Sequence, residues 1–299
     1  MSLSICLLNY NSFSDTIECI DSLLNQTIID FDIIVVDNCS TNNSVHNITA
    51  YFSDKEISYT FYNHKNYQFS SVTSESNQKT NVFLIATDVN EGFSSGNNIA
   101  INFSKSYLQN SILLLLNNDT VVDSDFVRLM IEEYQGFQKR FQTPLALGAM
   151  EKSYFTSQKT HTGFHYLHLP SGLALPKAIF PSFKYICGAC LMTDINAPLL
   201  NESYFLYYED ADYSKQLIRN NYKLFTTHKV SYYHKISSSM TDNKLMINYQ
   251  FESMWKFYKT YYPYFIPVVC LSRTIQYLIL LKFSVIKAIL STLTKSLKG

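Results

Sequence analysis

The stretch Asp32-Ile33-Ile34-Val35-Val36-Asp37 is a continuous run of β-branched residues between two acids. It predicts a parallel strand, because a strand covered by helices on both faces is apolar on both sides. Other short apolar runs predict strands at Ser4–Leu8, Val82–Ala86 and Ser111–Leu116. Helical spacing of apolar residues predicts helices at Asp15–Leu24, Phe93–Leu108 and Asp123–Tyr134. This alternation predicts an α/β fold, with a mixed, mostly parallel central sheet flanked by helices.

The composition fits a globular protein with a large core. Of 299 residues, 46% are hydrophobic and 16% are charged, which argues against disorder. The 24 basic and 24 acidic residues balance, so binding to nucleic acid by bulk electrostatics is not expected. The N-terminus is typical of a first strand rather than a signal peptide. Six scattered cysteines, including the pair Cys187 and Cys190, are expected to be buried and reduced in a cytoplasmic protein.

Two stretches interrupt the α/β rhythm. Residues 54–81 are rich in Ser, Asn and Lys and predict a surface excursion. Residues 151–182 predict a loop-rich segment with three prolines. The rhythm returns with a helix predicted over Glu209–Asn220 and short strands ending at His234. We therefore expect one α/β domain over residues 1–240, made of two halves at about 1–122 and about 123–240, and a C-terminal helical extension over 241–299.

The C-terminal stretch Cys270–Gly299 predicts a basic amphipathic helix. Its apolar residues follow helical spacing at Leu278, Leu281, Val285 and Ile289. The opposite face carries Ser284, Lys287, Ser291, Lys295 and Lys298. Such a helix is suited to an anionic membrane surface, and it is equally suited to packing on the α/β domain or on a partner subunit. The sequence leaves both alternatives open.

Polar residues follow three of the predicted strands. They are Asn9-Tyr10-Asn11, Asp37-Asn38-Cys39-Ser40 and Asn117-Asn118-Asp119-Thr120. In open α/β sheets, ligands bind beyond the carboxyl ends of the strands, so these residues predict a site. Asp119 is a candidate ligand for a hard divalent cation. Its alternative interpretation is a residue at the start of the next helix.

The segment Tyr207-Tyr208-Glu209-Asp210-Ala211-Asp212-Tyr213 places three carboxylates at a predicted helix start. The helix N-terminus stabilises them, while mutual repulsion raises at least one pKa, as suits a general base. The alternative is a solvated acidic helix start. His234 ends a short strand and gains significance only if it lies beside Asp119. His161-Thr-Gly-Phe-His165 has weak metal-ligand spacing, because it falls in the loop-rich segment.

Seven motifs in order resemble those of one family. They are Asn9-Tyr10-Asn11, Val35-Val36-Asp37-Asn38-Cys39-Ser40, Asn90-Glu91-Gly92-Phe93-Ser94-Ser95-Gly96-Asn97-Asn98, Leu115-Leu116-Asn117-Asn118-Asp119, Gly188-Ala189-Cys190-Leu191-Met192, Phe205-Leu206-Tyr207-Tyr208-Glu209-Asp210-Ala211-Asp212 and Tyr233-His234-Lys235. Together they resemble the family 2 glycosyltransferases of GT-A fold, especially the bacterial rhamnosyltransferase-like and galactofuranosyltransferase-like branch. The resemblance covers about residues 2–240, and it implies a catalytic domain over 1–240 with a nucleotide-binding half at about 1–122 and an acceptor half at about 123–240. Each motif is degenerate, but the ordered set is specific.

The resemblance implies roles for individual residues. Those implied to bind the donor are Asn9, Tyr10, Asp37, Asn97, Asn117 and Asn118, with Asp37 bonded to the nucleotide base. Asp119 is implied to hold Mg²⁺ or Mn²⁺ against the diphosphate, with His234 completing the coordination. Asp210 matches the catalytic base, with Glu209 beside it. Asn117 stands where many relatives carry an acid, which leaves strict metal dependence open.

The implied activity is inverting transfer of a sugar from a nucleotide-diphosphate sugar, such as a dTDP-rhamnose-like or UDP-sugar donor, to a hydroxyl. The expected acceptor is a glycan or lipid-linked acceptor in bacterial surface polysaccharide synthesis, at the inner face of the cytoplasmic membrane. A sugar-phosphate nucleotidyltransferase is disfavoured, because no Gly- and Arg-rich loop follows the first strand. A catalytically silent sugar-nucleotide-binding assembly subunit stays an alternative because of Asn117.

Overall fold

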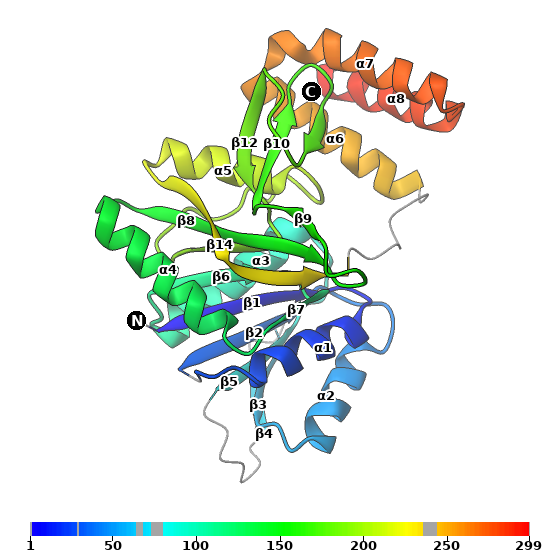
Figure 1. Ribbon diagram of the computed structural model, residues 1–299. Helices are drawn as coiled ribbons and strands as arrows, with labels where there is room; N and C mark the ends of the chain where they lie inside the picture. Colours follow the sequence, from blue (N-terminus) through cyan, green and yellow to red (C-terminus); the bar gives the residue numbers. More distant parts are fainter. Residues whose placement is uncertain (1, 29, 64–67, 73–79, 236–243, 299) are drawn as a thin grey trace.

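The structure is a computed structural model that describes residues 2–28, 30–63, 68–72, 80–235 and 244–298. Figure 1 shows a central sheet with helices on both faces and, at one end, a smaller sheet beside the C-terminal helices. The central strands are β1 (Leu3–Asn9), β2 (Phe31–Asp37), β3 (Tyr59–Asn63), β4 (Gln68–Val72), β5 (Asn81–Ala86), β6 (Ile112–Leu116), β7 (Thr120–Val122), β8 (Leu145–Ser153), β9 (Lys159–His161), β13 (Cys190–Asp194) and β14 (Lys223–His234).

The smaller sheet and the helices complete the fold. The three strands of the smaller sheet are β10 (Phe164–His168), β11 (Leu173–Leu175) and β12 (Ser182–Ile186). The helices are α1 (Phe13–Leu24), α2 (Ser44–Asp54), α3 (Phe93–Phe103), α4 (Phe126–Phe141), α5 (Glu209–Arg219), α6 (Lys244–Tyr261), α7 (Ile266–Ile279) and α8 (Phe283–Lys298). The predicted strands and helices of the first half are confirmed, with shifts of a few residues at their ends.

The order of the central sheet is β4-β3-β5-β2-β1-β6-β13-β8-β14-β7, with β9 paired to β8. Strands β3, β5, β2, β1 and β6 run parallel to one another, while β4 at the edge is antiparallel to β3. Strand β13 is antiparallel to both β6 and β8, and β14 is parallel to β8. The predicted mixed, mostly parallel sheet is therefore confirmed. The carboxyl ends of β1, β2 and β6 meet at one edge, where their polar residues follow.

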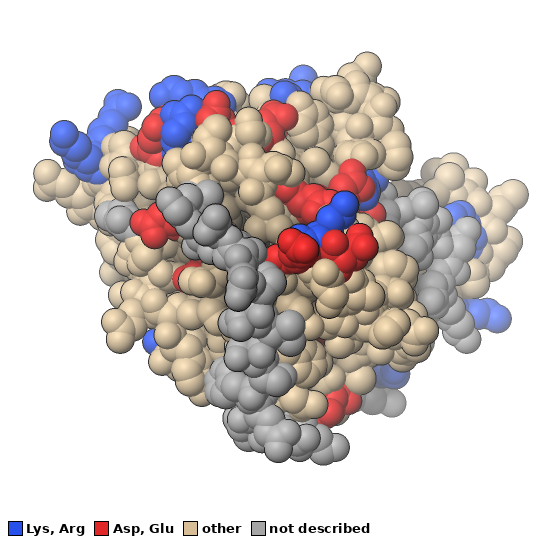
Figure 2. Space-filling view, turned by 90° about the horizontal axis from the view of Figure 1, so that it is seen from below, with Lys and Arg blue, Asp and Glu red and all other residues tan. Residues whose placement is uncertain are grey.

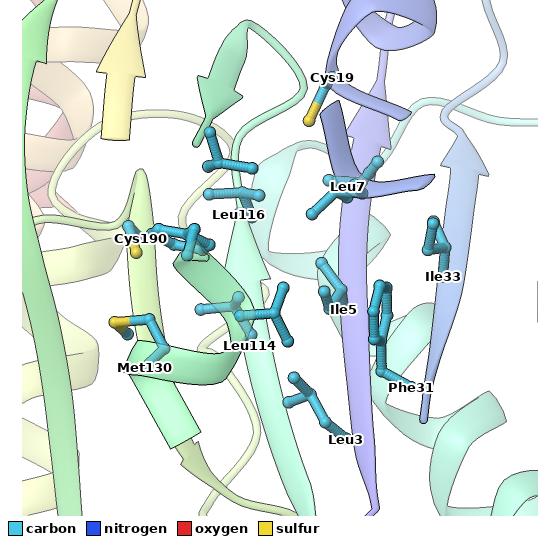
Figure 3. Close-up of a cluster of buried hydrophobic side chains, with 14 of the residues drawn as sticks. Leu3, Ile5, Leu7, Cys19, Phe31, Ile33, Leu114, Leu116, Met130 and Cys190 are labelled. Carbon is cyan, nitrogen blue, oxygen red and sulfur yellow. The ribbon is translucent and has the colours of Figure 1, made fainter. Parts of the chain in front are cut away.

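The core lies in two layers, one on each face of the sheet. Figure 3 shows the first layer, in which alternate residues of β1 and β2 pack with Cys19 of α1 and Met130 of α4. Helix α2 belongs to the same layer. On the other face, Ile34 and Val36 belong to a layer that includes buried residues of α3 and α5, and α3 packs on β2. Each buried Leu, Ile or Val of these layers stabilises the fold by about 1.5–3 kcal/mol.

Two predictions about the interrupted stretches need correction. Within residues 54–81, the described part contains β3 and β4, which extend the sheet edge, while 64–67 and 73–79 lie outside the described residues. The segment 151–182 is rich in loops as predicted, but between the loops it also contains the end of β8 and strands β9, β10 and β11. The short strands predicted before His234 form one long strand, β14, with an irregularity between Thr226 and Ser231.

The C-terminal helices pack onto the smaller sheet. Trp255 of α6 is fully buried among aromatic side chains of β12 and residues of α8, and its indole N–H donates to Thr292 at 3.1 Å. The predicted single amphipathic helix is two helices, α7 and α8, that pack against each other. Val285 and Ile289 are buried, so that face of α8 packs on the protein, the second of the two alternatives. Among the described helices, none is long and apolar enough to cross a bilayer.

Charged side chains are mixed in sign over the face shown in Figure 2, which views the molecule from below. Acidic and basic groups lie next to one another there, separated by larger neutral areas. One cluster in the structure is Lys235 between Asp15 and Glu18, at 2.6 Å and 2.5 Å from their carboxylate oxygens. On this face the described residues form no extended patch of one sign, in line with the zero net charge.

Candidate active site

A chain of hydrogen bonds connects the ends of β1, β2 and β6. Asn118 Nδ2 donates to Thr16 Oγ1 at 2.8 Å, and Thr16 Oγ1 donates to Asn9 Oδ1 at 2.8 Å. Asn9 Nδ2 in turn donates to Asp37 Oδ2 at 2.6 Å, and Ser40 donates to both oxygens of Asp37. These contacts hold the three strand ends in register. Asn9 and Asp37 are 0% and 2% exposed, so their polar groups serve this network.

Two other predicted donor-binding residues differ in exposure. Tyr10 is 43% exposed and is available to a ligand at the sheet edge. Asn97 is buried, and its Nδ2 donates to the carbonyl oxygen of Phe93 within α3 at 2.9 Å. Asn117 precedes Asn118 at the end of β6 and is half-buried. The structure thus places Asn97 inside its own helix rather than at the open edge.

Asp119 and His234 lie together, as the resemblance implies. Asp119 follows β6, and β14 brings His234 next to it by pairing with β7, so that Nε2 of His234 is 3.0 Å from Oδ1 of Asp119. Burial alone lowers the pKa of His234, but its hydrogen bonds to Asp119 and Glu151 outweigh burial and raise that pKa to about 9. The imidazole is therefore held between two carboxylates.

Glu151 is a member of this cluster that the sequence did not single out. It ends a buried part of β8 and is 3% exposed. One of its oxygens is 2.8 Å from Nδ1 of His234, and it also accepts from Tyr232 at 3.1 Å. Burial opposes its ionisation, but hydrogen bonds from His161 and His234 outweigh burial and hold the pKa of Glu151 below its usual range. Its partners are distant in sequence, so no local pattern reveals it.

His161 and His165 also come together, with Cys187 beside them. Ligand-type atoms of the three side chains lie within 4.8 Å of one another. Nδ1 of His161, however, accepts from the Gly163 N–H at 3.0 Å, and its Nε2 lies 3.0 Å from Glu151 Oε2. The backbone thus occupies Nδ1, whereas Nε2 is within ion-pair distance of Glu151 without a hydrogen bond of good geometry. We interpret the cluster as packing that supports Glu151.

Asp210 and Glu209 begin α5, as predicted. Tyr207 and Tyr208 precede them with φ of 68° and 65°, a left-handed conformation that is uncommon outside glycine. This turn directs the first residues of α5 toward β12. Asp210 Oδ2 accepts from the Gly188 N–H at 3.2 Å, and a Cβ at Gly188 would lie 3.1 Å from the Cβ of Asp210. The backbone of the Gly188 motif therefore positions Asp210.

The two acids have raised pKa values for a clear physical reason. Burial is the largest cause at both positions, and the charge of Asp210 raises the pKa of Glu209 further. Backbone N–H groups of Gly188 and Ala211 partly offset this effect at Asp210. Oε2 of Glu209 is buried without a hydrogen-bond partner. The third acid, Asp212, is 1% exposed and accepts from Tyr261 of α6, so its role is structural.

A cavity of about 370 Å³ opens in front of Asp210. Its walls come from the smaller sheet, α5, α6 and α7, and its lining includes His165, Tyr207, Glu209, Asp210, Gln250 and Arg273. This size suits a small ligand or a sugar unit. Asp37 and Asp119 are not part of this lining. The predicted site residues therefore form two groups, one at the strand ends and one in the cavity, with Glu151 and His161 between them.

The residues at Asp119 fit a divalent cation. Carboxylate oxygen and imidazole nitrogen are donors that Mn²⁺ and related ions accept. Glu151 holds Nδ1 of His234, which leaves Nε2 directed at Asp119, and a carboxylate behind a metal-binding histidine is the usual supporting arrangement. Asp119 and His234 would hold the ion, with Asn117 and Asn118 as neutral neighbours.

The mixed sheet, with its polar strand ends and the acidic start of α5, defines the GT-A class of glycosyltransferase fold. Solved structures share this architecture. GalNAc-T7 with UDP, GalNAc and Mn²⁺ is 10% identical with a TM-score of 0.63, over 89% of this chain and 49% of that chain. The mannosyltransferase PcManGT from Pyrobaculum calidifontis, with GDP-Man and Mn²⁺, is 10% identical with a TM-score of 0.54, over 99% and 75%. TarS from S. aureus with UDP is 13% identical with a TM-score of 0.52, over 93% and 72%.

The chain belongs to glycosyl transferase family 2, whose sequence profile matches residues 4–194. That match includes the strand-end motifs and Asp119, and it ends before Asp210 and His234. A search of curated protein sequences finds no match. The family resemblance of the sequence is thus confirmed, while the roles of individual residues stay predictions.

Proposed function

We propose that this protein is an inverting glycosyltransferase that moves a sugar from a nucleotide-diphosphate sugar to an acceptor hydroxyl. The observation that carries the proposal is the cavity in front of Asp210, a carboxyl group whose raised pKa suits a general base. Family membership supports the reaction class. The nucleotides bound to the similar folds, UDP and GDP-Man among them, support a nucleotide-sugar donor.

Asp119 and His234 would hold Mg²⁺ or Mn²⁺ at the strand ends. The ion, when bound, offsets the negative charge of the departing nucleoside diphosphate. Tyr10 borders the nucleotide with its exposed ring, and Asn9 and Asp37 keep the strand ends rigid beneath it. Asn117 and Asn118 complete this donor-binding edge, and Asn97 supports it from within α3.

Asp210 would accept the proton of the acceptor hydroxyl as the new bond forms on the opposite face of the sugar, which inverts the anomeric centre. General-base assistance of this kind is typically worth about 10²–10⁴-fold. Glu209 lies beside Asp210, and burial, followed by the charge of Asp210, raises the pKa of Glu209. Because its pKa is raised, ionised Asp210 is a stronger base than an ordinary carboxylate, and after transfer it passes the proton on to solvent.

The proposal extends to the branch, the acceptor and the domains. We expect a rhamnosyltransferase-like or galactofuranosyltransferase-like enzyme that acts on a glycan or lipid-linked acceptor in surface polysaccharide synthesis. Residues 1–240 would form the catalytic domain and 241–299 its helical extension. A cytoplasmic enzyme with this acceptor would bind the inner face of the membrane as a peripheral protein.

Membrane binding, in this proposal, uses α7 rather than α8. Val268, Leu271, Ile275 and Leu278 form one row along α7, and each is more than 40% exposed. Beyond Glu252 the sequence has seven Lys or Arg residues and no Asp or Glu. An exposed apolar row with surrounding cations fits an anionic lipid surface. Deletion of residues 270–299 does not test this point, because it exposes Trp255.

A panel of nucleotide sugars tests the proposed function. Purified protein is melted with UDP-, GDP- and dTDP-sugars, each with Mn²⁺ or with EDTA. The donor at a hundredfold excess over its Kd stabilises the fold by about 2.7 kcal/mol, and EDTA reduces the effect. Asp119→Asn should lose the Mn²⁺-dependent part. Stabilisation without turnover would instead favour a catalytically silent binding subunit, and no stabilisation by any donor would contradict both functions.

A further inference from the structure

Arg273 is a buried cation in the cavity that holds Asp210. It projects from α7, is 3% exposed, and lines the cavity with Glu209 and Asp210. Among the described residues, no carboxylate forms an ion pair with it. Its Nε has no hydrogen-bond partner, although the group is buried. A buried charge without a counter-ion costs several kcal/mol, so its retention at this position needs a reason.

The neighbours of Arg273 orient the guanidinium without neutralising it. Nη1 donates to Gln276 Oε1 at 2.8 Å, and Nη2 donates to the Tyr277 hydroxyl at 3.3 Å. The rings of Phe251 and Tyr277 lie 5.7 Å and 5.3 Å from its central carbon. These contacts hold a planar fork of N–H donors in place and leave its formal charge unpaired. Such a fork matches the oxygens of a phosphate group.

We propose that Arg273 is a phosphate-binding subsite for the acceptor substrate. This inference rests on the proposed function, in which Asp210 removes a proton from the acceptor. The acceptor must then occupy the cavity in front of Asp210, and Arg273 lines the same cavity. The donor diphosphate belongs with Asp119, which is outside that lining. The phosphate at Arg273 is therefore part of the acceptor.

The charge of the cavity is compatible with an anion. Glu209 and Asp210 have raised pKa values because of burial, so the pair carries less negative charge near neutral pH than two ordinary carboxylates. The hydroxyl of Tyr208 donates a hydrogen bond of 3.0 Å to the carbonyl oxygen of Gly172. Both residues line the cavity and add no charge to it. A guanidinium in this setting attracts a phosphate more strongly than it would at an exposed position.

The position of Arg273 on α7 favours a lipid-linked phosphate. Val269 and Arg273 are on the buried side of the helix, whereas Leu271, Ile275 and Leu278 are on the exposed apolar side. One side of α7 thus faces the cavity, and the other offers an apolar surface within a helix diameter of it. A phosphate carried by a polyol instead of a lipid would offer Arg273 the same oxygens. The experiment below compares a lipid phosphate with a polyol phosphate.

Calorimetric titration in EDTA tests the subsite with three probes: inorganic pyrophosphate, farnesyl diphosphate and glycerol 3-phosphate. Arg273→Met removes the charge and keeps most of the side-chain length, and Lys287→Met removes an exposed cation of α8 as a matched control. We expect Arg273→Met to weaken pyrophosphate and farnesyl diphosphate binding at least tenfold, Arg273→Lys to weaken it less, and Lys287→Met to leave it unchanged. Farnesyl diphosphate should bind more tightly than glycerol 3-phosphate.

Several outcomes would overturn the proposal. If the wild type and folded Arg273→Met bind pyrophosphate equally well, Arg273 does not form a phosphate-binding subsite. If Arg273→Met does not fold, Arg273→Lys decides, because binding equal to the wild type shows that the fork has no role. If Arg273→Met weakens Mn²⁺-dependent UDP binding as much as it weakens pyrophosphate binding, the phosphate bound by Arg273 belongs to the donor. Failure of the proposed function would give a different result. In that case no nucleotide sugar would bind, while the binding of pyrophosphate would still depend on Arg273.

Discussion

Glu151 connects the two groups of site residues. Its carboxylate meets His234 on the side of Asp119 and His161 on the side of Asp210. A buried carboxylate with several donors is well stabilised, and the removal of its charge leaves those donors without an ionised partner. The sequence identified Asp119, His234 and Asp210 from motifs. It did not identify Glu151, because this lone acid gains its role from residues 10 and 83 positions away.

Glu151→Gln should weaken the binding of Mn²⁺ to the protein–nucleotide complex by about 10–100-fold, the usual effect of losing a supporting carboxylate. The amide keeps the shape of the side chain but cannot offset charge on His234. Free Mn²⁺ is measured by electron paramagnetic resonance during titration. Glu132→Gln, at an exposed position of α4, is the control and should have no effect. A twofold change or less for Glu151→Gln would rule out this positioning role.

Glu209→Gln should stabilise the protein at neutral pH by about 1–3 kcal/mol, because burial penalises ionisation of this carboxyl in the folded protein and an amide does not ionise. The folded protein holds the Glu209 proton to a higher pH than the unfolded chain, so the wild type loses stability as pH rises from about 4 through the raised pKa. The gain from Gln must therefore vanish below about pH 4. Urea unfolding at pH 7.5 and pH 4 measures it, and a gain equal at both pH values would contradict the explanation.

At the scale of elements, the spacing of apolar residues was sufficient to predict the helices and strands that pack in the main core. Strands β1, β2, β5 and β6 and helices α1, α3, α4 and α5 follow from their apolar residues, because each contributes to a sheet face or packs on one. The strands between residues 151 and 182 did not follow. They are short, several prolines interrupt them, and the smaller sheet is stabilised by packing against α6 and α8. Because these contacts join segments that are far apart in the chain, they produce no pattern in the local sequence.

Gly188→Ala should lower turnover by about 10–100-fold while the protein stays folded. The added Cβ would lie 3.1 Å from the Cβ of Asp210, so the start of α5 must shift by a few tenths of an ångström. Catalytic groups misplaced by up to 1 Å lose rates of this order. Gly136→Ala on α4 is the matched control, because nothing lies within 4 Å of its Cβ. Steady-state kinetics check the effect, and unchanged turnover in Gly188→Ala would show that Asp210 needs no such support.

At the scale of the whole molecule, α7 relates the cavity to the surface. Its buried side carries Arg273, and its exposed side carries an apolar row. The sequence predicted a basic amphipathic helix with its apolar face on Leu278, Leu281, Val285 and Ile289. In the structure Leu278 and Leu281 are exposed, and the buried members of that face are Val285 and Ile289. These residues face α6 because the tail folds back as a pair of helices. Periodicity shows that a face is apolar, and only the tertiary fold shows what covers it.

Leu271→Ser with Leu278→Ser should reduce binding to vesicles that contain phosphatidylglycerol by about tenfold, since two half-exposed apolar side chains no longer enter the lipid. Flotation with anionic and neutral vesicles measures the bound fraction, and neutral vesicles should bind little. Val89→Ser with Phe155→Ser, which alters exposed apolar residues elsewhere, is the control. Equal flotation of the α7 variant and the wild type would remove α7 from membrane binding.

The central claim is that Asp119 and Asp210 serve one reaction, with the donor held at the strand ends and the acceptor proton removed in the cavity. The most direct measurement compares the wild type and Asp210→Asn in the same preparation, by titrating the nucleotide sugar with Mn²⁺ and then following sugar transfer. The account predicts that Asp210→Asn binds the donor as tightly as the wild type and loses turnover by at least about 10²-fold. Turnover within a few-fold of the wild type would contradict it.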